Sequence, residues 1–470
     1  MHDVIFREYD IRGVVGTEFF IEQVYDMTDA ILRYFIRCNP LTNTVVVGRD
    51  VRTHSEPIYR EICRCLLDNG CTVLDIGVCT SPMVYYALSK LSAQTGIMVT
   101  ASHNAKEYNG LKLYVGTQMI HGSALQEIRK LYKDNRHNIT VQKFLRGTQH
   151  HRDITSEYIA SLCHEFEHLQ YSSLPLVFDC ANGAAGVVLP RLLEQMRCTN
   201  VQILYPELDG TFPHHSADPI IEENMKDLAN AVQSRNAIVG IGFDGDADRM
   251  CAVDHVGTLL SGDMLLALFA QHLDTAYMHR PVIYDVNASE GLSELLSVWG
   301  MTSVMAPCGH AHIKSAMQKY NAVLGGEISC HFLFEDRGWS VDDGIYAALR
   351  LIEILHKDPN ALDAIMQMFP ARIRSPRYRL PCAEQDKLRF VQAVYEYCKH
   401  NTSAELSTVD GVRIKMAGSV GLVRASNTQA ALCFTFEANT YDALYDVQRL
   451  VANALAPIYT HNLYETFKLK

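Results

Sequence analysis

The sequence predicts an α/β protein made of three similar mixed α/β domains and a smaller C-terminal α+β domain. Short apolar runs alternate with amphipathic helical stretches along most of the chain, as in strands that alternate with helices. This alternation restarts near residues 150 and 257. In each of the three segments a polar loop follows an apolar strand, and ligands of such folds gather at the carboxyl ends of strands.

The length of the chain agrees with this organisation. A chain of 470 residues has room for about three or four domains of ordinary size. The segment 371–376, rich in Arg and ending in Pro, is expected to link the last domain to the others. The expected domains span residues 1–149, 150–256, 257–370 and 371–470.

The first domain should contain an antiparallel pair of strands. The strand at 111–115 follows the strand at 96–99 too closely for a helical crossover. The other elements expected in this domain are strands at 45–47 and 72–76 and a helix at 56–67.

The second and third domains repeat the alternation of strand and helix. In the last domain, one helix precedes the strands in the sequence and another follows them. The elements expected in the second and third domains are strands at 175–179, 201–204, 237–243, 282–285 and 322–324, and helices at 222–234, 262–272 and 345–355. Those expected in the last domain are helices at 384–399 and 441–455 and strands at 412–416, 421–424 and 431–436.

Composition and charge exclude several classes of protein. The net charge is −11 and the pI is near 6.0, whereas nucleic-acid binding needs a basic surface. The 14 cysteines are scattered without CxxC pairs, as is typical of reduced thiols in the cytosol. The N-terminus lacks a signal-peptide pattern, and no apolar run is long enough to span a bilayer. We therefore expect a cytoplasmic protein without nucleic-acid or membrane partners.

Three carboxylates, Asp244, Asp246 and Asp248, alternate with small residues directly after an expected strand. Their mutual repulsion is unfavourable when uncompensated, so a bound cation is a natural solution. Oxygen ligands suit Mg²⁺ or Ca²⁺ better than zinc. An EF-hand does not fit, because its sixth and twelfth positions would be Arg249 and His255 instead of Gly and Glu. A solvated acidic turn is the simpler alternative.

Ser102 lies in a small polar loop, residues 100–104, that follows an expected strand. Magnesium is usually held by few carboxylates and a phosphate oxygen, and a phosphoryl group on Ser102 would supply that oxygen. Lys112 and Arg249 could neutralise charge in a phosphoryl-transfer transition state. A capped turn and a hydrolase triad are the alternatives. No G-x-S-x-G elbow is present, and the adjacent Ser102 and His103 need not face each other.

Two later loops carry side chains that suit a sugar phosphate. Glu327 and Ser329 offer a carboxylate and a hydroxyl for the hydroxyl groups of a sugar ring. The segment 424–428 combines a guanidinium with short polar side chains, and arginine can bind phosphate through two parallel hydrogen bonds. Either loop alone could be a capped turn. The segment 9–13, which places an Arg beside a Gly, is by default a surface loop.

Taken together and in this order, these segments resemble the α-D-phosphohexomutase superfamily, at its bacterial phosphomannomutase/phosphoglucomutase branch. The resemblance covers essentially the whole chain. The family's T-x-S-H-N, D-G-D-x-D-R and R-x-S-N-T loops match residues 100–104, 244–249 and 424–428, its G-E-M-S-G-H sugar loop resembles residues 326–331, and the segments 6–13 and 342–346 also match.

The resemblance implies four domains around a central cleft and a reversible conversion of hexose 1-phosphate to hexose 6-phosphate, with mannose, glucose or both as the sugar. Ser102 would be phosphorylated in the resting enzyme and would donate to the substrate. The resulting hexose 1,6-bisphosphate, also an activator, would reorient and return its other phosphate to Ser102. One Mg²⁺ per chain would be held by phosphorylated Ser102 with Asp244, Asp246 and Asp248. The enzyme would be an isomerase that acts on small-molecule sugar phosphates as a monomer.

The same resemblance implies the roles of individual residues. The residues expected around the transferring phosphoryl group, some of them as acid–base candidates, are Arg12, His103, Lys112, Arg249 and His310. Glu327 and Ser329 are expected to bind the sugar hydroxyls, and Tyr9 and His331 are also expected to bind the substrate. Those expected to hold the non-reacting phosphate are Arg424, Ser426, Asn427 and Thr428.

Several positions depart from the family's pattern. Asn287 stands where the branch often has a Lys near the transferred phosphate. The other departures are Ala105 for a Pro after Ser-His-Asn, Cys330 for a Gly of the sugar loop, and Gln429-Ala430 for the usual Glu-Pro.

Three functional alternatives stay open. The first is a phosphoglucosamine mutase, a class whose corresponding loops resemble G-E-Q-S-G-H and R-x-S-G-T. Here Ile328 replaces the Gln of the first loop and Asn427 replaces the Gly of the second, which favours plain hexose phosphates. A catalytically weak homologue that only binds sugar phosphates would be expected to lose some reactive residues, and none is lost. An aspartyl phosphotransferase would use Asp244 as nucleophile and Asp246 as acid, but its loop normally has Thr or Val in place of Asp248. The sequence leaves the choice between mannose and glucose open.

Overall fold

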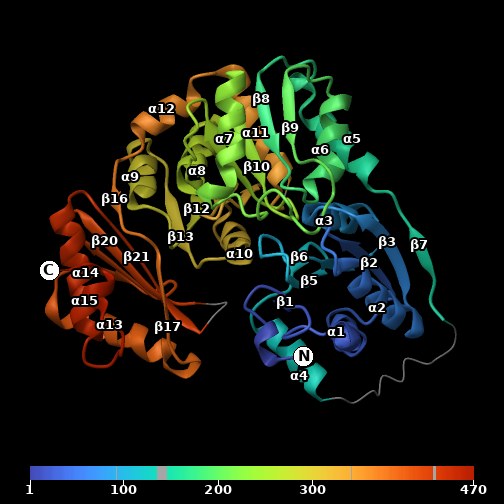
Figure 1. Ribbon diagram of the computed structural model, residues 1–470, viewed down its shortest axis with the longest axis horizontal. Coiled ribbons are helices and arrows are strands. Elements are labelled where there is room, and N and C mark those ends of the chain that lie inside the picture. Colours follow the sequence, from blue (N-terminus) through green and yellow to red (C-terminus); the bar gives the residue numbers. More distant parts are fainter. Residues whose placement is uncertain (92, 135–145, 340, 427–429, 470) are drawn as a thin grey trace. The chain divides into compact units, whose positions relative to one another are not determined.

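The computed structural model describes residues 1–470 except 92, 135–145, 340, 427–429 and 470. The chain forms two compact units, and Figure 1 shows their helices and strands coloured along the sequence. The first unit consists of Met1–Ser261, Ser329–Phe334 and Trp339–Leu362, and the second consists of Gly262–Ile328, Glu335–Gly338 and Asp363–Lys470. Among the described residues, no helix has both the length and the apolar composition that crossing a membrane requires.

The N-terminal sheet of the first unit is mixed. Its strands, in spatial order, are β1 (Ile11–Val14), β5 (Tyr108–Val115), β4 (Thr95–Val99), β2 (Thr44–Arg49), β3 (Thr72–Val78) and β7 (Gln149–His151), with β6 (Gln118–Met119) beside β5. The pairs β4–β2, β2–β3 and β3–β7 are parallel. Strand β5, in contrast, is antiparallel to both of its neighbours, β4 and β1. Met98 pairs with Lys112, which confirms the expected antiparallel pair.

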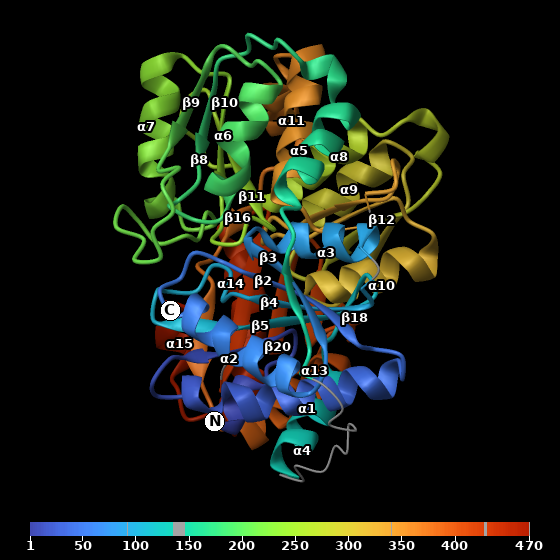
Figure 2. The same cartoon turned by 90° about the vertical axis from the view of Figure 1, so that its right-hand side faces the viewer.

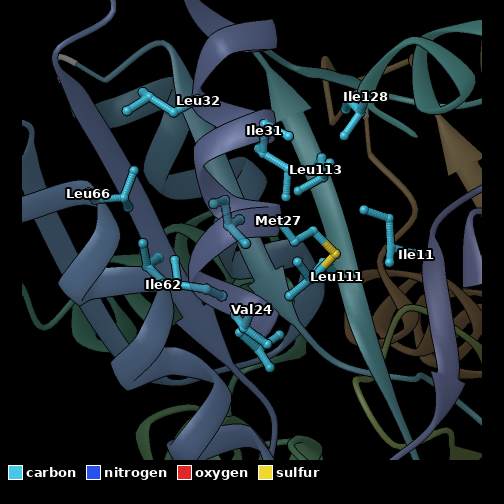
Figure 3. Close-up of a cluster of buried hydrophobic side chains, with 14 of the residues drawn as sticks. Ile11, Val24, Met27, Ile31, Leu32, Ile62, Leu66, Leu111, Leu113 and Ile128 are labelled. Atoms are coloured by element: carbon cyan, nitrogen blue, oxygen red, sulfur yellow. The ribbon is translucent and has the colours of Figure 1, made fainter. Parts of the chain in front are cut away.

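Helices cover both faces of this sheet: α1 (Val24–Cys38), α2 (Ser55–Asp68) and α4 (Ser123–Lys133) lie on one face, and α3 (Ser81–Lys90) lies on the other. Figure 3 shows Met27 of α1 between Ile62 of α2 and Leu111 of β5. Because successive strand residues point to opposite faces, Gly96 points toward α3, where a Cβ would lie 3.1 Å from Leu88.

The second sheet of this unit leads directly to the acidic loop. Its strands, in spatial order, are β11 (Met250–Asp254), β10 (Val239–Phe243), β8 (Leu176–Asp179) and β9 (Val201–Leu204). Strand β8 is parallel to β9 and β10, whereas β11 returns antiparallel to β10. The helices around it are α5 (Thr155–Glu165), α6 (Ala185–Gln195), α7 (Lys226–Arg235) and α11 (Gly344–Lys357). Figure 2 shows α7 and α5 on opposite sides of the sheet. The unit also contains β15 (Phe332–Phe334).

The second unit holds two sheets of different kinds. In the first sheet, β12 (Val282–Asp285) is parallel to β13 (Ser303–Ala306) on one side and to β14 (Leu324–Gly326) on the other. The second sheet is antiparallel and is formed by the C-terminal strands. The C-terminal strands, in spatial order, are β16 (Ile373–Arg374), β21 (Ala431–Ala438), β20 (Ser419–Ala425), β19 (Val412–Met416) and β18 (Glu405–Ser407), with β17 (Tyr378–Pro381) beside β21.

Helices of the second unit complete both cores. Those of its first part are α8 (Gly262–Gln271), α9 (Glu290–Val298) and α10 (His310–Tyr320), and those of its last part are α13 (Lys387–Asn401), α14 (Tyr441–Leu455) and α15 (Leu463–Thr466). Val394 of α13 and Val447 of α14 share one buried cluster with Phe434 of β21. Helix α12 (Ala361–Met368) begins in the first unit and ends in the second. The expected class, α/β segments followed by a smaller α+β segment, is confirmed.

The structure also corrects the sequence analysis locally. The segment 9–13, expected to be a surface loop, overlaps β1 (Ile11–Val14), an edge strand that pairs with β5. Strand β11 and helix α1 were not among the expected elements. A four-residue edge strand has too short an apolar run to be recognised by its period, and its strand conformation comes from pairing with β5.

Candidate active site

The serine loop, residues 100–107, turns sharply after β4. Ser102 is buried and has a φ of 49°, in the left-handed region that residues other than glycine seldom adopt. Its N–H donates to Thr100 Oγ1 at 2.9 Å. Its Oγ donates to Asp244 Oδ2 at 2.6 Å and lies 3.2 Å from His103 Nδ1. The hydroxyl is therefore directed at a carboxylate, and the adjacent imidazole is also within hydrogen-bond range.

The metal loop, residues 244–249, joins β10 to β11 and lies against the serine loop. A Cβ on Gly245 would lie 2.5 Å from Ser102 O, so only glycine allows this approach. Asp244, Asp246 and Asp248 are buried, and each offers an oxygen within 4.8 Å of the others. Oδ1 of Asp246 has no hydrogen-bond partner among the described residues, whereas Oδ1 of Asp248 lies 3.3 Å from His331 Nε2. Buried carboxylate oxygens without donors fit a hard divalent cation such as Mg²⁺.

Lys112 supplies the positive charge nearest to this acid cluster. Its Nζ lies 2.6 Å from Asp246 Oδ2 and also contacts Asp248 Oδ2. Burial and the charges of Asp248 and Asp246 raise the pKa of Asp244 well above its ordinary value. Burial also acts to raise the pKa of Asp248, but Lys112 and His331 outweigh it and hold that pKa well below the ordinary value. One lysine thus stabilises the ionised form of part of the cluster and leaves Asp244 under repulsion.

Further cations and imidazoles surround the serine and metal loops. Arg12 of β1 donates to Asn104 Oδ1 at 2.5 Å and pairs with Asp10. Arg249 Nε lies 3.8 Å from Asp244 Oδ2. The pKa of the His103 imidazole lies well below its ordinary value because of burial and the charges of Arg249 and Arg12.

His331 links the sugar loop to the metal loop. Its Nε2 lies 3.1 Å from Arg249 Nε and 3.3 Å from Asp248 Oδ1, and its Nδ1 lies 3.2 Å from Ser329 Oγ. A neutral ring accepts from Arg249, and a protonated ring donates to Asp248. Cys330 between them has a φ of 66°, which explains why glycine suits this position in the family's pattern.

The second unit holds the other part of the sugar loop. Glu327 is buried, and its Oε1 accepts the Gly309 N–H at 2.6 Å. Burial and the charge of Glu327 raise the pKa of Asp285 to about 7. Asn287 donates to Asp285 Oδ2 at 2.8 Å. His310, also buried, is the first residue of α10.

The predicted phosphate loop begins at the end of β20. Arg424 pairs with Asp410 Oδ2 at 2.9 Å. Gly411 allows this pairing, because its φ is 81° and a Cβ there would lie 2.7 Å from Arg424 Cβ. Ser426 is buried, and its carbonyl accepts a hydrogen bond from Lys387 Nζ at 2.7 Å. Asn427 and Thr428 lie outside the described residues.

A hollow opens in the second unit near Asn287. Arg374 and Arg413 line it and form ion pairs with Asp263 and Glu290, each at 2.8 Å. Arg377 also lines it, and its charge acts to lower the pKa of Asp285. The surroundings of Asn287 therefore contain cations even though its own side chain is neutral.

The predicted site residues divide between the two units. The first unit brings Ser102 together with the acid cluster and its cations; it contains Tyr9, Arg12, Ser102, His103, Lys112, Asp244, Asp246, Asp248, Arg249, Ser329 and His331. The second unit contains His310, Glu327, Arg424 and Ser426.

Sequence reasoning missed two residues of the first unit that contact the site. Ser81 Oγ donates to Asp246 Oδ2 at 2.5 Å, and buried Arg52 donates to Ser102 O at 2.7 Å. A signal was present for Ser81, since it is a polar residue after β3 and opens α3 ahead of Pro82. Arg52 follows β2 in the same manner.

Comparison with known protein families agrees with this fold. Models of the phosphoglucomutase/phosphomannomutase alpha/beta/alpha domains I, II and III match residues 3–138, 156–257 and 261–372. The chain therefore belongs to the α-D-phosphohexomutase superfamily.

Similarity to individual relatives shows which branch of the superfamily the chain belongs to. The chain is 36% identical over 455 residues to a phosphomannomutase/phosphoglucomutase of Pseudomonas aeruginosa, covering 97% of this chain and 96% of that protein. It is 32% identical over 446 residues to a phosphoglucomutase of Neisseria gonorrhoeae, with 94% and 95% covered. A crystal structure of a phosphoglucomutase/phosphomannomutase family protein from Burkholderia thailandensis has a TM-score of 0.87 at 29% identity, with 98% and 99% covered. Within the superfamily, the chain is a member of the bacterial phosphomannomutase/phosphoglucomutase branch.

Proposed function

We propose that the protein is a phosphohexomutase, an isomerase that reversibly converts hexose 1-phosphate to hexose 6-phosphate through a phosphoserine at Ser102. The observation that carries this proposal is the position of Ser102 Oγ, 2.6 Å from Asp244 Oδ2. Two further buried carboxylates and the Lys112 ammonium lie beside it. Phosphoryl transfer needs this combination of positioning and charge more than it needs covalent chemistry from the protein.

Each half-reaction transfers one phosphoryl group. The bond between phosphorus and Ser102 Oγ breaks while a sugar hydroxyl oxygen bonds to phosphorus, which gives hexose 1,6-bisphosphate. The hydroxyl proton leaves the sugar oxygen, and Ser102 Oγ takes up a proton. After the intermediate reorients, its other phosphate returns to Ser102. His103 is an acid–base candidate beside Ser102 Oγ. The cations proposed to stabilise the transferring group are Arg12, Lys112, Arg249 and, when protonated, His310.

One magnesium ion per chain would complete this site. Asp244, Asp246 and Asp248 would hold it with an oxygen of phosphorylated Ser102. The ion would supply positive charge to the phosphoryl oxygens.

The substrate would be held by two groups of residues, one for the sugar and one for the non-reacting phosphate. We propose that the sugar is bound by Tyr9, Glu327, Ser329 and His331, and the non-reacting phosphate by Arg424, Ser426, Asn427 and Thr428. The names of the Pseudomonas and Neisseria relatives support mannose and glucose phosphates as the substrates to compare first. A cytoplasmic monomer is the state proposed for the enzyme, and light scattering on the purified protein tests the monomer.

A coupled assay with Mg²⁺ and a trace of glucose 1,6-bisphosphate tests the proposal. Glucose 1-phosphate and mannose 1-phosphate are compared for the wild type, Ser102→Ala and Asp246→Asn. Ser89→Ala is the matched control, because Ser89 is an exposed serine of α3. We expect turnover in the wild type and the control, and a loss of about 100-fold or more in the two site variants, as when an electrostatic catalytic group is removed.

Intact mass measurement locates the phosphate. After treatment with the bisphosphate, the wild type should gain one phosphoryl group and Ser102→Ala should gain none. Turnover by Ser102→Ala at the wild-type rate, or phosphate found on Asp244, would reject the serine mechanism. A folded wild type that binds the sugar phosphates without turnover would instead indicate a binding-only homologue.

A further inference from the structure

Arg52 is a fully buried arginine whose side chain is enclosed by the serine loop. Its side-chain exposure is 0%. All five of its N–H donors are used: Nε donates to Asp50 Oδ2 at 3.1 Å, and the remaining four donate to backbone carbonyls. These carbonyls are those of Ser102 (2.7 Å), Asn104 (2.6 Å), Ala105 (2.8 Å) and Tyr108 (3.1 Å).

The four acceptors follow the serine loop from the reactive residue to the first residue of β5. Their convergence on one planar guanidinium fixes the orientation of four peptide groups at once. One of these belongs to Ser102, whose left-handed backbone needs support from its surroundings. The loop is therefore folded around the arginine side chain.

Asp50 holds the beginning of the same loop. Its Oδ2 accepts from Thr100 Oγ1 at 2.8 Å, and its Oδ1 accepts from Ser55 Oγ at 2.5 Å and from the Arg52 N–H at 3.0 Å. Thr100 Oγ1 in turn accepts the Ser102 N–H. Asp50 and Arg52 thus hold Ser102 from both its N–H side and its carbonyl side.

The other face of Arg52 is covered by the segment 210–212, which follows β9 in the same unit. The guanidinium carbon lies 5.2 Å from the centre of the Phe212 ring. Arg52 also forms an isolated bridge with Gly210, where a Cβ would lie 2.6 Å from Arg52 Cα. The guanidinium itself is shielded from water, so its hydrogen bonds hold the loop more firmly than those of an exposed arginine would.

We propose that Arg52 is a positioning residue for phosphoryl transfer: its guanidinium holds the serine loop in the conformation that directs Ser102 Oγ at the metal loop. This inference rests on the proposed function of Ser102. A lysine could supply the same charge, but its ammonium has three donors and no planar fork. The geometry of the guanidinium, and not its charge alone, is therefore what the loop requires.

The test compares Arg52→Lys and Arg52→Ala with the wild type, and uses Arg60→Lys and Arg60→Ala as matched controls. Arg60 is exposed on α2 and forms a 2.9 Å ion pair with Glu56, one turn away. Because a misplacement of about 1 Å can lower a rate by about 100-fold, we expect kcat of Arg52→Lys to fall by about that factor while KM for the sugar phosphate changes little. Phosphorylation of Ser102 by glucose 1,6-bisphosphate, followed by intact mass, should slow by a similar factor.

Circular dichroism and urea unfolding establish that each variant is folded before it is assayed. Wild-type kcat in folded Arg52→Lys would overturn the proposal. So would equal losses in kcat and in the folded fraction, or failure of both variants to fold, since Arg52 would then be only a structural residue. Ser102→Ala separates the two claims. If Ser102→Ala is active, the serine mechanism fails; if it is inactive while Arg52→Lys is fully active, only the role of Arg52 fails.

Discussion

Lys112 illustrates, at the scale of a single residue, how one charge keeps an acid cluster buried. Its side chain is 4% exposed and contacts both Asp246 and Asp248. Lys112→Met leaves these carboxylates without their cation, and removal of one partner from a buried ion pair destabilises a protein by about 3–5 kcal/mol. We expect the free energy of unfolding, measured with urea in EDTA, to fall by that amount. Added Mg²⁺ should raise the free energy of unfolding, because ligand binding stabilises the folded state. The rise should be larger in the variant than in the wild type, because the variant's carboxylates have lost the Lys112 charge.

Lys226→Met is the control for Lys112→Met, because Lys226 is 62% exposed and its ion pair with nearby Glu223 is exposed too. It should change stability little. Equal responses of the wild type and Lys112→Met to Mg²⁺ would show that the ion does not bind at the acid cluster.

The same scale shows what could be predicted from the sequence. The alternating spacing of Asp244, Asp246 and Asp248 is a local pattern, so it could be recognised before the fold was known. Arg52 could not, because its four carbonyl acceptors lie about fifty positions further along the chain. Backbone carbonyls occur at every residue, so no side-chain pattern marks them as its partners.

At the scale of elements, the loop after β9 is tied to the end of β8 by a histidine. His215 Nε2 lies 3.0 Å from Asp179 Oδ2, and its Nδ1 lies 3.0 Å from Ser216 O. Burial opposes the charged ring, but the hydrogen bond and charge of Asp179 outweigh it and raise the pKa of His215 above its ordinary value. A histidine pKa raised on folding contributes stability that is fully present below the unfolded pKa of about 6.5 and is lost as pH rises through the folded pKa.

His215→Gln should remove this pH-dependent contribution. The urea midpoint of the wild type should exceed that of the variant below about pH 6.5, and the difference should shrink as the pH rises above the folded pKa. His400→Gln is the control, since His400 is 69% exposed at the end of α13. A wild-type advantage that grows with pH would contradict the assigned role of the Asp179 pair.

Element prediction succeeded where sequence spacing alone constrains the chain. The short connection from β4 to β5 forces an antiparallel return, and the structure has it. Element prediction failed for β11. This strand pairs antiparallel with β10, Met250 opposite Phe243, so that the two strands flank the metal loop. The sequence there shows a polar loop and an apolar run, and only pairing with β10 makes that run a strand.

At the scale of the whole molecule, buried ion pairs join the two parts of the second unit. In the second unit a buried carboxylate of α9, Glu290, pairs with Arg413 of β19 at 2.8 Å and with Lys415 at 2.5 Å. Its N–H donates to Glu437 Oε1 of β21 at 2.7 Å. These contacts join the parallel part of the unit to its C-terminal sheet, so the two parts should unfold together.

Glu290→Gln should break this connection. Arg413 is 6% exposed, and leaving such a charge unpaired destabilises a protein by about 3–5 kcal/mol. The chain has two tryptophans, Trp339 in the first unit and Trp299 in the second. In the Trp339→Phe background, Trp299 fluorescence should report a urea midpoint lowered by Glu290→Gln. In the Trp299→Phe background, Trp339 should report a smaller shift. Asp446→Asn, on α14 of the same unit, should move neither midpoint, because Asp446 and its partner Arg449 are both exposed. Equal shifts of both tryptophans would mean that the units unfold as one cooperative block, because destabilisation of one unit is then shared by the whole chain.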